Sequence, residues 1–227
     1  MALILSIETS TTVCSVALTD RDAVLAKEIL YTEQSHSTHL TLLIEAVLTK
    51  AGRQMIELDA VAVSEGPGSY TGLRIGVSTA KGLCYVLGIP LIAISTLSAM
   101  AYQAIQLERT DELLVPMLDA RRMEVYTATF TRDLKMTEQV RPVILDEQSF
   151  AETLQSQSML FFGNGAGKFQ EIMKHERASF VNDLVPEAWA VGLLAQKKHA
   201  GSVFEDLAYS EPNYLKAYQA TKPKKLL

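Results

Sequence analysis

The chain has 227 residues, of which 48% are hydrophobic and 21% charged, with a formal net charge of -5 at pH 7. Such a length and composition are typical of one large globular domain or two small ones. The acidic balance argues against autonomous nucleic-acid binding, which normally needs a basic face. Charged residues interrupt every apolar stretch before the ~20 residues that a membrane-spanning helix needs, so no membrane contact is expected.

The beginning of the chain, MALILSIETST, reads as a first strand. It lacks the basic region of a signal peptide and runs directly into a polar turn. Cys14 and Cys84 both stand among apolar residues, which suits small buried hydrophobic side chains in a reducing compartment. A cytoplasmic location is therefore expected.

Hydrophobic periodicity predicts alternating strands and helices along the chain. In the first half, strands are expected at 3–7, 13–19, 24–31, 60–64 and 91–94, and helices at 37–51 and 71–87. In the second half, strands are expected at 113–118, 124–131, 139–144 and 159–162, and helices at 149–156, 169–174 and 186–198. The order of three strands, helix, strand and helix thus occurs twice, which indicates a duplicated unit.

The predicted domains are an N-terminal domain at 1–103 and a C-terminal domain at 104–210. No low-complexity linker separates them, so they should share an interface and a cleft. A tail at 211–227 is expected to pack back onto the body through aromatic residues of the C-terminal region, namely Tyr209, Tyr214 and Tyr218.

The turn after the first predicted strand contains Glu8, Thr9, Ser10 and Thr11. A carboxylate, hydroxyls and backbone amides in one turn could hold a phosphate or orient a magnesium-bound water. A plain polar hairpin turn is the competing interpretation, because Ser and Thr favour such turns for local hydrogen bonding.

The segment GPGSYTGLRIG, at 66–76, is the most distinctive string of the chain. Its first glycines permit backbone angles closed to other residues, and Ser69 or Thr71 can cap the following helix. The start of that helix could receive an anion. The string is not a P-loop, since no Gly-Lys-Ser or Gly-Lys-Thr follows.

Small residues recur along one face of this predicted helix, at Gly72, Gly76 and Ala80. A glycine inside a helix costs about 1 kcal/mol relative to alanine, so a compensating contact is expected. The bare face could admit another element of the same chain or a partner protein. The residues alone leave both alternatives open.

Other polar residues carry weaker signals. His36 and His39 are too few to hold a metal ion, and no HExxH pattern accompanies them. Asp119, Arg121 and Arg122 lie between two predicted strands and suggest a solvated, salt-bridged corner. The string GNGAGK, at 163–168, indicates a flexible turn between strand and helix. No arrangement of Ser, His and Asp, or of Cys and His, indicates nucleophilic catalysis.

Several strings together resemble the TsaB (YeaZ) family across nearly the whole chain. They are ILSIETSTTVCSVAL, GPGSYTGLRIG, STAKGLCYVLGIPL, MLDARRMEVY and EPNYL. The duplicated plan resembles the actin-like ATPase superfamily (ASKHA, ribonuclease-H-like). The resemblance implies an α/β fold of two actin-like domains in tandem with a shared cleft.

The resemblance also implies a non-catalytic role. The related family TsaD has two metal-binding histidines four residues apart, where this chain has Thr96 and Met100. Neither side chain suits a hard or borderline metal. The TsaB family supports threonylcarbamoylation of adenosine 37 (t6A) in tRNAs. Its implied partners are TsaD, the P-loop protein TsaE and, when alone, a second copy; tRNA is contacted only indirectly.

The family contacts use helices of the N-terminal domain, which suggests a partner surface. Its expected residues are His39, Leu43, Gly72, Leu73, Gly76 and Ala80. On this hypothesis a bulky residue at position 76 abolishes the complex and leaves the monomer folded. Glu8 stands where the superfamily usually has aspartate, so no tightly bound cofactor is expected, and ATP or ADP only at a complex interface. The alternative is a nucleotide-dependent actin-like enzyme, such as a small-molecule kinase.

Overall fold

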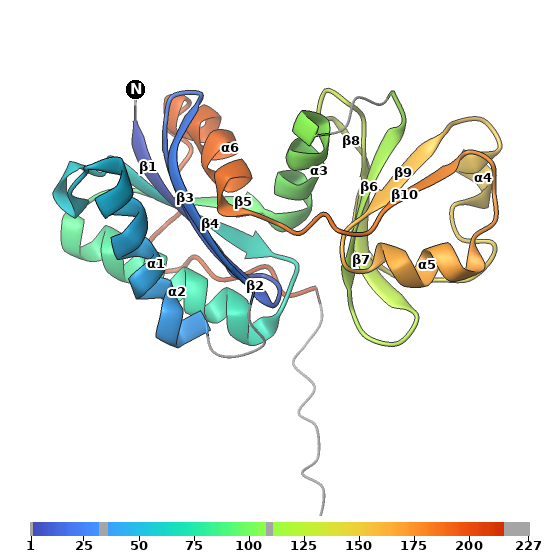
Figure 1. Cartoon of the computed structure of the whole chain (residues 1–227), viewed down its shortest axis with the longest axis horizontal. Helices are drawn as coiled ribbons and strands as arrows, with labels where there is room; N and C mark the ends of the chain where they lie inside the picture. The colour runs from blue at the N-terminus through green and yellow to red at the C-terminus, as the bar shows by residue number, and fades with distance from the viewer. Residues whose placement is uncertain (1, 32–35, 108–110, 216–227) are drawn as a thin grey trace, which may run out of the picture.

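The computed structural model describes residues 2–31, 36–107 and 111–215, which form two five-stranded sheets (Figure 1). The first sheet consists of β1 (Leu3–Glu8), β2 (Val13–Asp20), β3 (Ala23–Tyr31), β4 (Ala60–Gly66) and β5 (Leu91–Ser95). The second consists of β6 (Leu113–Asp119), β7 (Glu124–Phe130), β8 (Met136–Ile144), β9 (Met159–Phe162) and β10 (Ala178–Val181).

The two sheets have the same topology. Their strand orders are β3-β2-β1-β4-β5 and β8-β7-β6-β9-β10. In each sheet the first three strands pair antiparallel, and the first strand pairs parallel with the fourth, which pairs parallel with the fifth. The duplication predicted from the sequence is confirmed.

The described part of the chain contains six α-helices. They are α1 (His36–Ala51), α2 (Tyr70–Leu87), α3 (Thr96–Leu107), α4 (Ala151–Leu154), α5 (Ala166–Ile172) and α6 (Ala188–Ala200), with a 3-10 turn at Met55–Glu57. In Figure 1, α1 and α2 cover the outer face of the first sheet, while α6 and α3 lie between the two sheets. No helix in the described part of the chain is long and apolar enough to span a membrane.

Burial follows from this layering. Every residue of β1 is buried because the strand lies in the middle of its sheet with helices on both faces. The edge strand β3 is largely exposed. Both cysteines are buried and free, as expected, and burial raises the pKa of Cys14 and of Cys84 to about 11.

Two elements were not predicted, α3 and β10. Helix α3 is buried on most of its circumference, so it lacks the polar stripe that makes a helix recognisable by its period. Strand β10 has four half-buried residues, too few to show a clear alternation. Helix α4 is shorter than predicted.

The last helix of each half joins the two halves. Helix α6 packs against β1, β2, β4 and β5 of the first sheet and against α3. Gln103 of α3 donates through Nε2 to the carbonyl oxygen of Val185 at 2.9 Å, and its Oε1 accepts from the amide of Glu187 at 3.3 Å. The predicted domain 104–210 thus includes a helix that covers the other sheet. Its boundaries, and the shared cleft, stay predictions.

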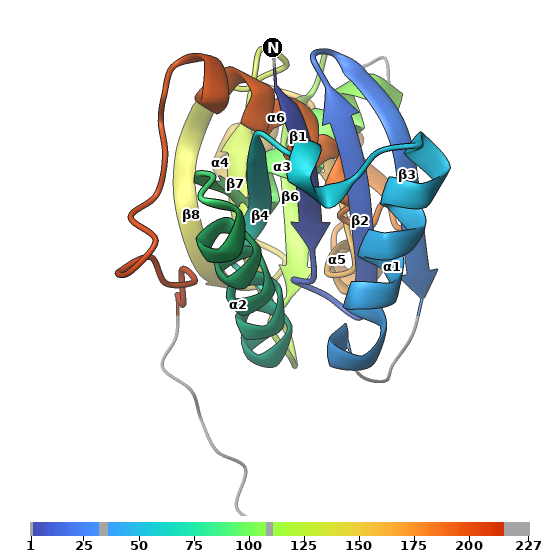
Figure 2. The same cartoon turned by 90° about the vertical axis from the view of Figure 1, so that its left-hand side faces the viewer.

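The carboxyl ends of the parallel strands lie at the lower edge of the molecule in both views (Figures 1 and 2). Four connecting segments lie at this edge. They are the turn after β1, the glycine loop from the end of β4 to α2 (residues 66–69), the turn after β6 and the loop after β9. Ligand sites of open α/β sheets occur outside the carboxyl ends of strands, so this edge contains the candidate site.

Candidate functional site

The glycine loop after β4 packs directly on the turn after β1. The amide of Ser69 donates to the carbonyl oxygen of Ser10 at 2.6 Å. A Cβ at Gly68 would lie 2.5 Å from that same oxygen, so only glycine allows the approach. Ser69 is also the N-cap of α2, since its hydroxyl accepts from the amide of Gly72 at 3.3 Å. The predicted capping is confirmed at Ser69.

Several polar groups of the β1–β2 turn are engaged within the chain, whereas Glu8 Oε2 and Ser10 Oγ are buried without a hydrogen-bond partner among the described residues. The amide of Ser10 donates to Glu8 Oε1 at 2.6 Å, and the hydroxyl of Thr9 donates to the carbonyl oxygen of Gly72 at 2.8 Å. His36 Nε2 lies 2.8 Å from the carbonyl oxygen of Thr11, which ties α1 to the same turn. Glu8, Thr9 and Ser10 are buried.

Burial dominates the electrostatics of Glu8. Desolvation raises the pKa of this carboxyl above its ordinary value, and hydrogen bonds with Ser10 partly oppose the effect. A phosphate or a hydrated magnesium ion would need these groups accessible from solvent, whereas the glycine loop covers them. The expectation that the chain binds no nucleotide tightly stays a prediction.

The small-residue stripe of α2 faces the interior of its own chain. A Cβ at Gly72 would lie 2.1 Å from the carbonyl oxygen of Thr9, and one at Gly76 would lie 2.3 Å from Thr9 Oγ1. Leu73 and Ala80 are completely buried. These four residues offer no bare face to a partner in this structure, and the intramolecular alternative accounts for the glycines.

His39 and Leu43 lie on α1 and are half-buried. Leu43 packs at the margin of the first core cluster, beside buried neighbours such as Leu40 and Val47. Helices α1 and α2 pack on each other. The role of His39 and Leu43 as partner contacts stays a prediction.

The chain returns to the glycine loop at its C-terminal end. The amide of Asn213 donates to the carbonyl oxygen of Glu65 at 2.7 Å. Tyr214 stacks on Tyr70 at a ring distance of 4.7 Å, and its hydroxyl accepts from Arg74 Nε at 3.1 Å. The predicted packing of Tyr214 onto the body is thus present, whereas Tyr209 is 84% exposed, so that part was wrong. Tyr218 lies outside the described residues.

In the second half, the loop after β9 and the start of α5 together hold the turn after β6. Lys168 Nζ donates to a carboxylate oxygen of Asp119 and to the carbonyl oxygen of Arg122, the latter at 2.8 Å. Asn164 Oδ1 accepts from the amide of Asp119 at 3.0 Å. The predicted salt-bridged corner is confirmed for Asp119. Its partner Lys168, which the sequence did not identify, comes from the GNGAGK string.

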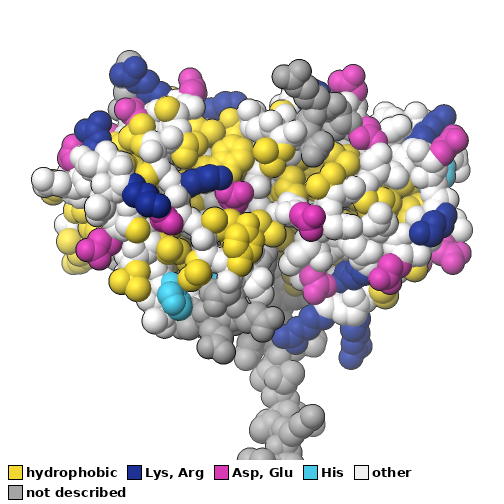
Figure 3. All heavy atoms as spheres, in the orientation of Figure 1, with side chains coloured by type: hydrophobic (Ala, Val, Ile, Leu, Met, Phe, Trp, Pro, Cys, Tyr) yellow, Lys and Arg dark blue, Asp and Glu magenta, His cyan; other side chains and the backbone are white. Residues whose placement is uncertain are grey.

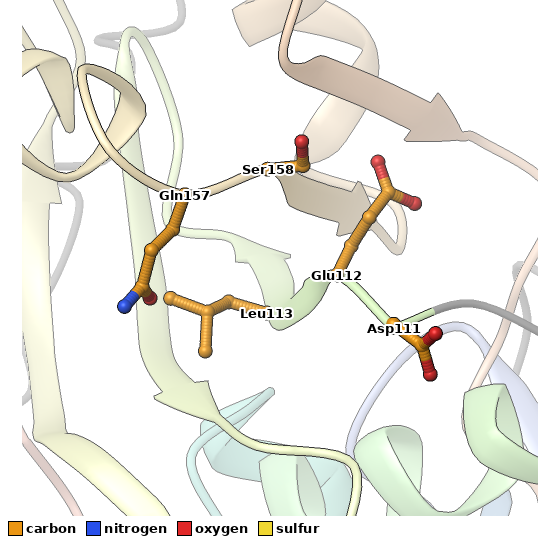
Figure 4. A pocket seen from close by; sticks show the side chains of 5 residues that line it. All are labelled: Asp111, Glu112, Leu113, Gln157 and Ser158. Atoms are coloured by element: carbon orange, nitrogen blue, oxygen red, sulfur yellow. The ribbon is translucent and has the colours of Figure 1, made fainter.

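A pocket of about 500 Å³ lies away from this edge, where β6 and β9 begin (Figure 4). It is lined by Asp111, Glu112, Leu113, Gln157 and Ser158. Glu112 already accepts a hydrogen bond from the hydroxyl of Ser179 at 2.7 Å. Among the described residues, no three His, Cys, Asp or Glu side chains are grouped so that they could hold a metal ion.

Comparison with known proteins identifies the family. The family model described as "TsaD: tRNA N6-adenosine threonylcarbamoyltransferase" matches residues 26–226. The "tRNA threonylcarbamoyladenosine biosynthesis protein TsaB" of Bacillus subtilis is 37% identical over 139 residues, covering 61% of this chain and 59% of the relative. The protein of that name from Escherichia coli is 36% identical over 130 residues, covering 57% and 55%. The chain thus spans less than two thirds of the length of these relatives.

Solved structures agree with the fold. A protein "with similarity to peptidase YEAZ" from Pseudomonas aeruginosa has a TM-score of 0.83 at 27% identity, covering 95% of this chain and all of the other. The activator of a dehydratase from Clostridium difficile, with bound ADPNP, has a TM-score of 0.54 at 10% identity, covering 88% of this chain and 96% of the other, and shows the fold alone. The predicted tandem of actin-like domains is confirmed. The chain belongs to the family described as TsaD: tRNA N6-adenosine threonylcarbamoyltransferase, and the named relatives to which it is similar are TsaB (YeaZ) proteins.

Proposed function

We propose that this chain is a non-catalytic subunit in the cytoplasmic threonylcarbamoylation of adenosine 37 in tRNAs. In this role it binds a catalytic TsaD protein, together with the P-loop protein TsaE, and forms a homodimer when alone. The names of the TsaB relatives, which refer to threonylcarbamoyladenosine biosynthesis, support the pathway.

The observation that carries the non-catalytic role concerns Thr96 and Met100. Both side chains are completely buried on α3, at the positions where the catalytic relative is expected to have its two histidines. Met100 belongs to the core cluster of the second half, and its terminal methyl group lies 2.6 Å from where a Cβ of Gly163 would be. A hydroxyl and a thioether in a packed core do not provide a site for a hard or borderline metal.

The partner surface belongs on the outer face of α1 and α2 rather than on the glycine stripe. Large apolar side chains are exposed there, with Leu42 58%, Tyr85 81% and Val86 80% accessible. Figure 3 shows hydrophobic atoms at the surface of this half of the molecule, among charged ones. Exposed apolar residues on two adjacent helices are typical of a protein interface. His39 and Leu43 lie on the same helix pair.

The chain holds no nucleotide tightly by itself, and ATP or ADP binds only where the complex forms. This proposal is supported by the glycine loop, which packs over Glu8, Thr9 and Ser10 and leaves them buried. A direct check is the melting temperature of the isolated chain with magnesium-ATP, since any ligand of the native state stabilises it. No shift is expected.

The decisive test is reconstitution. Unmodified tRNA is incubated with purified TsaD, TsaE, the threonylcarbamoyl donor and this chain, and modified adenosine is counted by mass spectrometry. Omitting this chain should abolish the product, and adding it back should restore the product. Undiminished product without it would overturn the proposal and favour a nucleotide-dependent enzyme.

Two variants locate the surface. Tyr85→Ala with Val86→Ala should weaken the complex with TsaD, as measured by size-exclusion chromatography, and reduce product in proportion. Ile144→Ala is the matched control, because Ile144 is 74% exposed on β8 of the other half. Equal complex formation by both variants would place the partner elsewhere.

A further inference from the structure

The turn between β6 and β7, residues 120–123, has an unusual backbone. Arg121 and Arg122 follow one another with φ of 71° and 49°. This left-handed region is unfavourable for residues with a side chain, and residues held there occur preferentially at functional sites. Glycine or asparagine would meet the same geometry at lower cost. The presence of two arginines therefore needs an explanation.

The turn is held by the segment after β9, which consists of a short loop and the first residues of α5. Lys168 Nζ donates to the carbonyl oxygens of Arg122 and Glu124 and to Asp119. A Cβ at Gly165 would lie 3.2 Å from the amide nitrogen of Asp119, so the loop after β9 packs against the base of the turn. These contacts hold the main chain of the turn, and Arg121 and Arg122 are both exposed.

The two guanidinium groups have no counter-charge among the residues that the structure describes. Both residues are exposed, and neither makes an ion pair with a residue that the structure describes. The neighbouring carboxylate, Asp119, is occupied by Lys168. Arg21 gives the contrast: it also has a positive φ, of 56°, at a hairpin turn, but Asp20 and Asp22 flank it and its Nε lies 4.0 Å from Asp20 Oδ1.

The position of the turn restricts the ligand. It projects at the lower edge where the parallel strands end (Figures 1 and 2), and Figure 3 shows basic side chains along that edge of the second half. The tip of a hairpin is convex, whereas small molecules bind in concave pockets that enclose them. Two exposed arginines on a projection whose main chain is held in place suit an extended polyanion, whose phosphates are the usual partners of arginine.

We propose that Arg121 and Arg122 bind the phosphate backbone of the substrate tRNA. The inference rests on the proposed function and revises the expectation that tRNA is contacted only indirectly. The net charge of -5 is consistent with a short contact that adds to binding by a complex rather than with autonomous binding.

The test uses a fluorescent, unmodified tRNA transcript and the purified complex of this chain with TsaD. Arg121→Gly with Arg122→Gly removes both guanidinium groups and relieves the backbone, so the melting temperature should stay equal or rise. Affinity, measured by anisotropy, should fall by about tenfold, and the slope of log affinity against log salt should fall by about 1 for each lost phosphate contact. Arg21→Gly is the matched control and should change neither quantity.

The outcomes separate the two proposals. Formation of the complex between this chain and TsaD is measured first. If the parent chain forms no complex, the proposed function is contradicted, and the phosphate contact is not the cause. If the complex forms, equal tRNA affinity and salt slope for the parent and the Arg121, Arg122 variant would overturn the phosphate contact. So would the absence of tRNA binding by the parent complex. Loss of ATP binding with unchanged tRNA binding would assign the arginines to a nucleotide instead and would also overturn it.

Discussion

The hydroxyl of Thr9 joins the end of β1 to the first turn of α2 by donating to the carbonyl oxygen of Gly72 at 2.8 Å. One helical turn further on, Gly76 faces the same hydroxyl. The two glycines thus serve a close approach within one chain. This contact connects the two most distinctive strings of the sequence.

Gly76→Ala should destabilise the isolated chain. The added Cβ would lie 2.3 Å from Thr9 Oγ1, and overpacking of this kind costs about 1–3 kcal/mol. Chemical denaturation measures the change in the free energy of unfolding. Thr9→Ala removes the opposing oxygen, so the double variant should lose less than the sum of the two single variants.

Gly82→Ala is the matched control on the same helix. Nothing lies within 4 Å of its added Cβ, so the higher helix propensity of alanine should stabilise the chain by up to about 1 kcal/mol. Equal destabilisation at positions 76 and 82 would contradict the contact with Thr9.

The sequence predicted the alternation of elements well because β1 to β9 and most helices have a strong periodic pattern or clear turn residues. It did not reveal α3, because a helix buried on most sides, with Thr96, Leu97 and Met100 all inaccessible, has no polar face. The stripe of α2 was recognised, but its neighbour was not. Small residues indicate a close approach and do not say which element approaches.

Glu8→Gln should stabilise the chain increasingly as pH rises. Burial raises the folded-state pKa of Glu8 above its ordinary value of 4.5, so the folded state binds this proton more tightly than the unfolded state. The contribution of Glu8 to stability is therefore fully present below pH 4.5 and is lost as pH rises through the folded pKa. Glutamine keeps an oxygen for the amide of Ser10 but cannot ionise.

The measurement is the free energy of unfolding of Glu8→Gln relative to the parent between pH 4 and about 8, the range in which a buried carboxyl titrates. Glu45→Gln, at an exposed position of α1, is the control. A difference for Glu8→Gln that does not grow with pH would show that the carboxyl ionises without cost in the folded chain.

For the candidate site, the sequence indicated which segments contain the relevant residues, but not which residues contact one another in the fold. Glu8, Thr9 and Ser10 were candidates for phosphate binding because a carboxylate, hydroxyls and backbone amides occur together in one turn. The glycine loop that covers them is 56 or more residues away in the chain, and its packing on Ser10 follows from tertiary structure alone. Lys168 was missed for the same reason, since 49 residues separate it from Asp119.

Gln103→Ala should weaken the junction of the two halves. The side chain is buried and satisfies both the carbonyl oxygen of Val185 and the amide of Glu187. Each backbone group left buried without a partner costs about 1–3 kcal/mol. Thermal unfolding should show a lower transition, whereas Gln106→Ala, at an exposed position of the same helix, should have little effect. Equal transitions for the two variants would mean that the halves are joined by α3–α6 packing alone.

Tyr214→Ala should release the C-terminal segment from the glycine loop. The variant loses the ring contact with Tyr70 and the hydrogen bond from Arg74, which together stabilise local closure by about 1–2 kcal/mol. Hydrogen exchange of the Asn213 amide, which donates to Glu65, should therefore become about 5–30-fold faster. Tyr209→Ala is the control, because Tyr209 is 84% exposed. If both variants exchanged at the parental rate, the Asn213–Glu65 hydrogen bond would hold the segment without help from the aromatic pair.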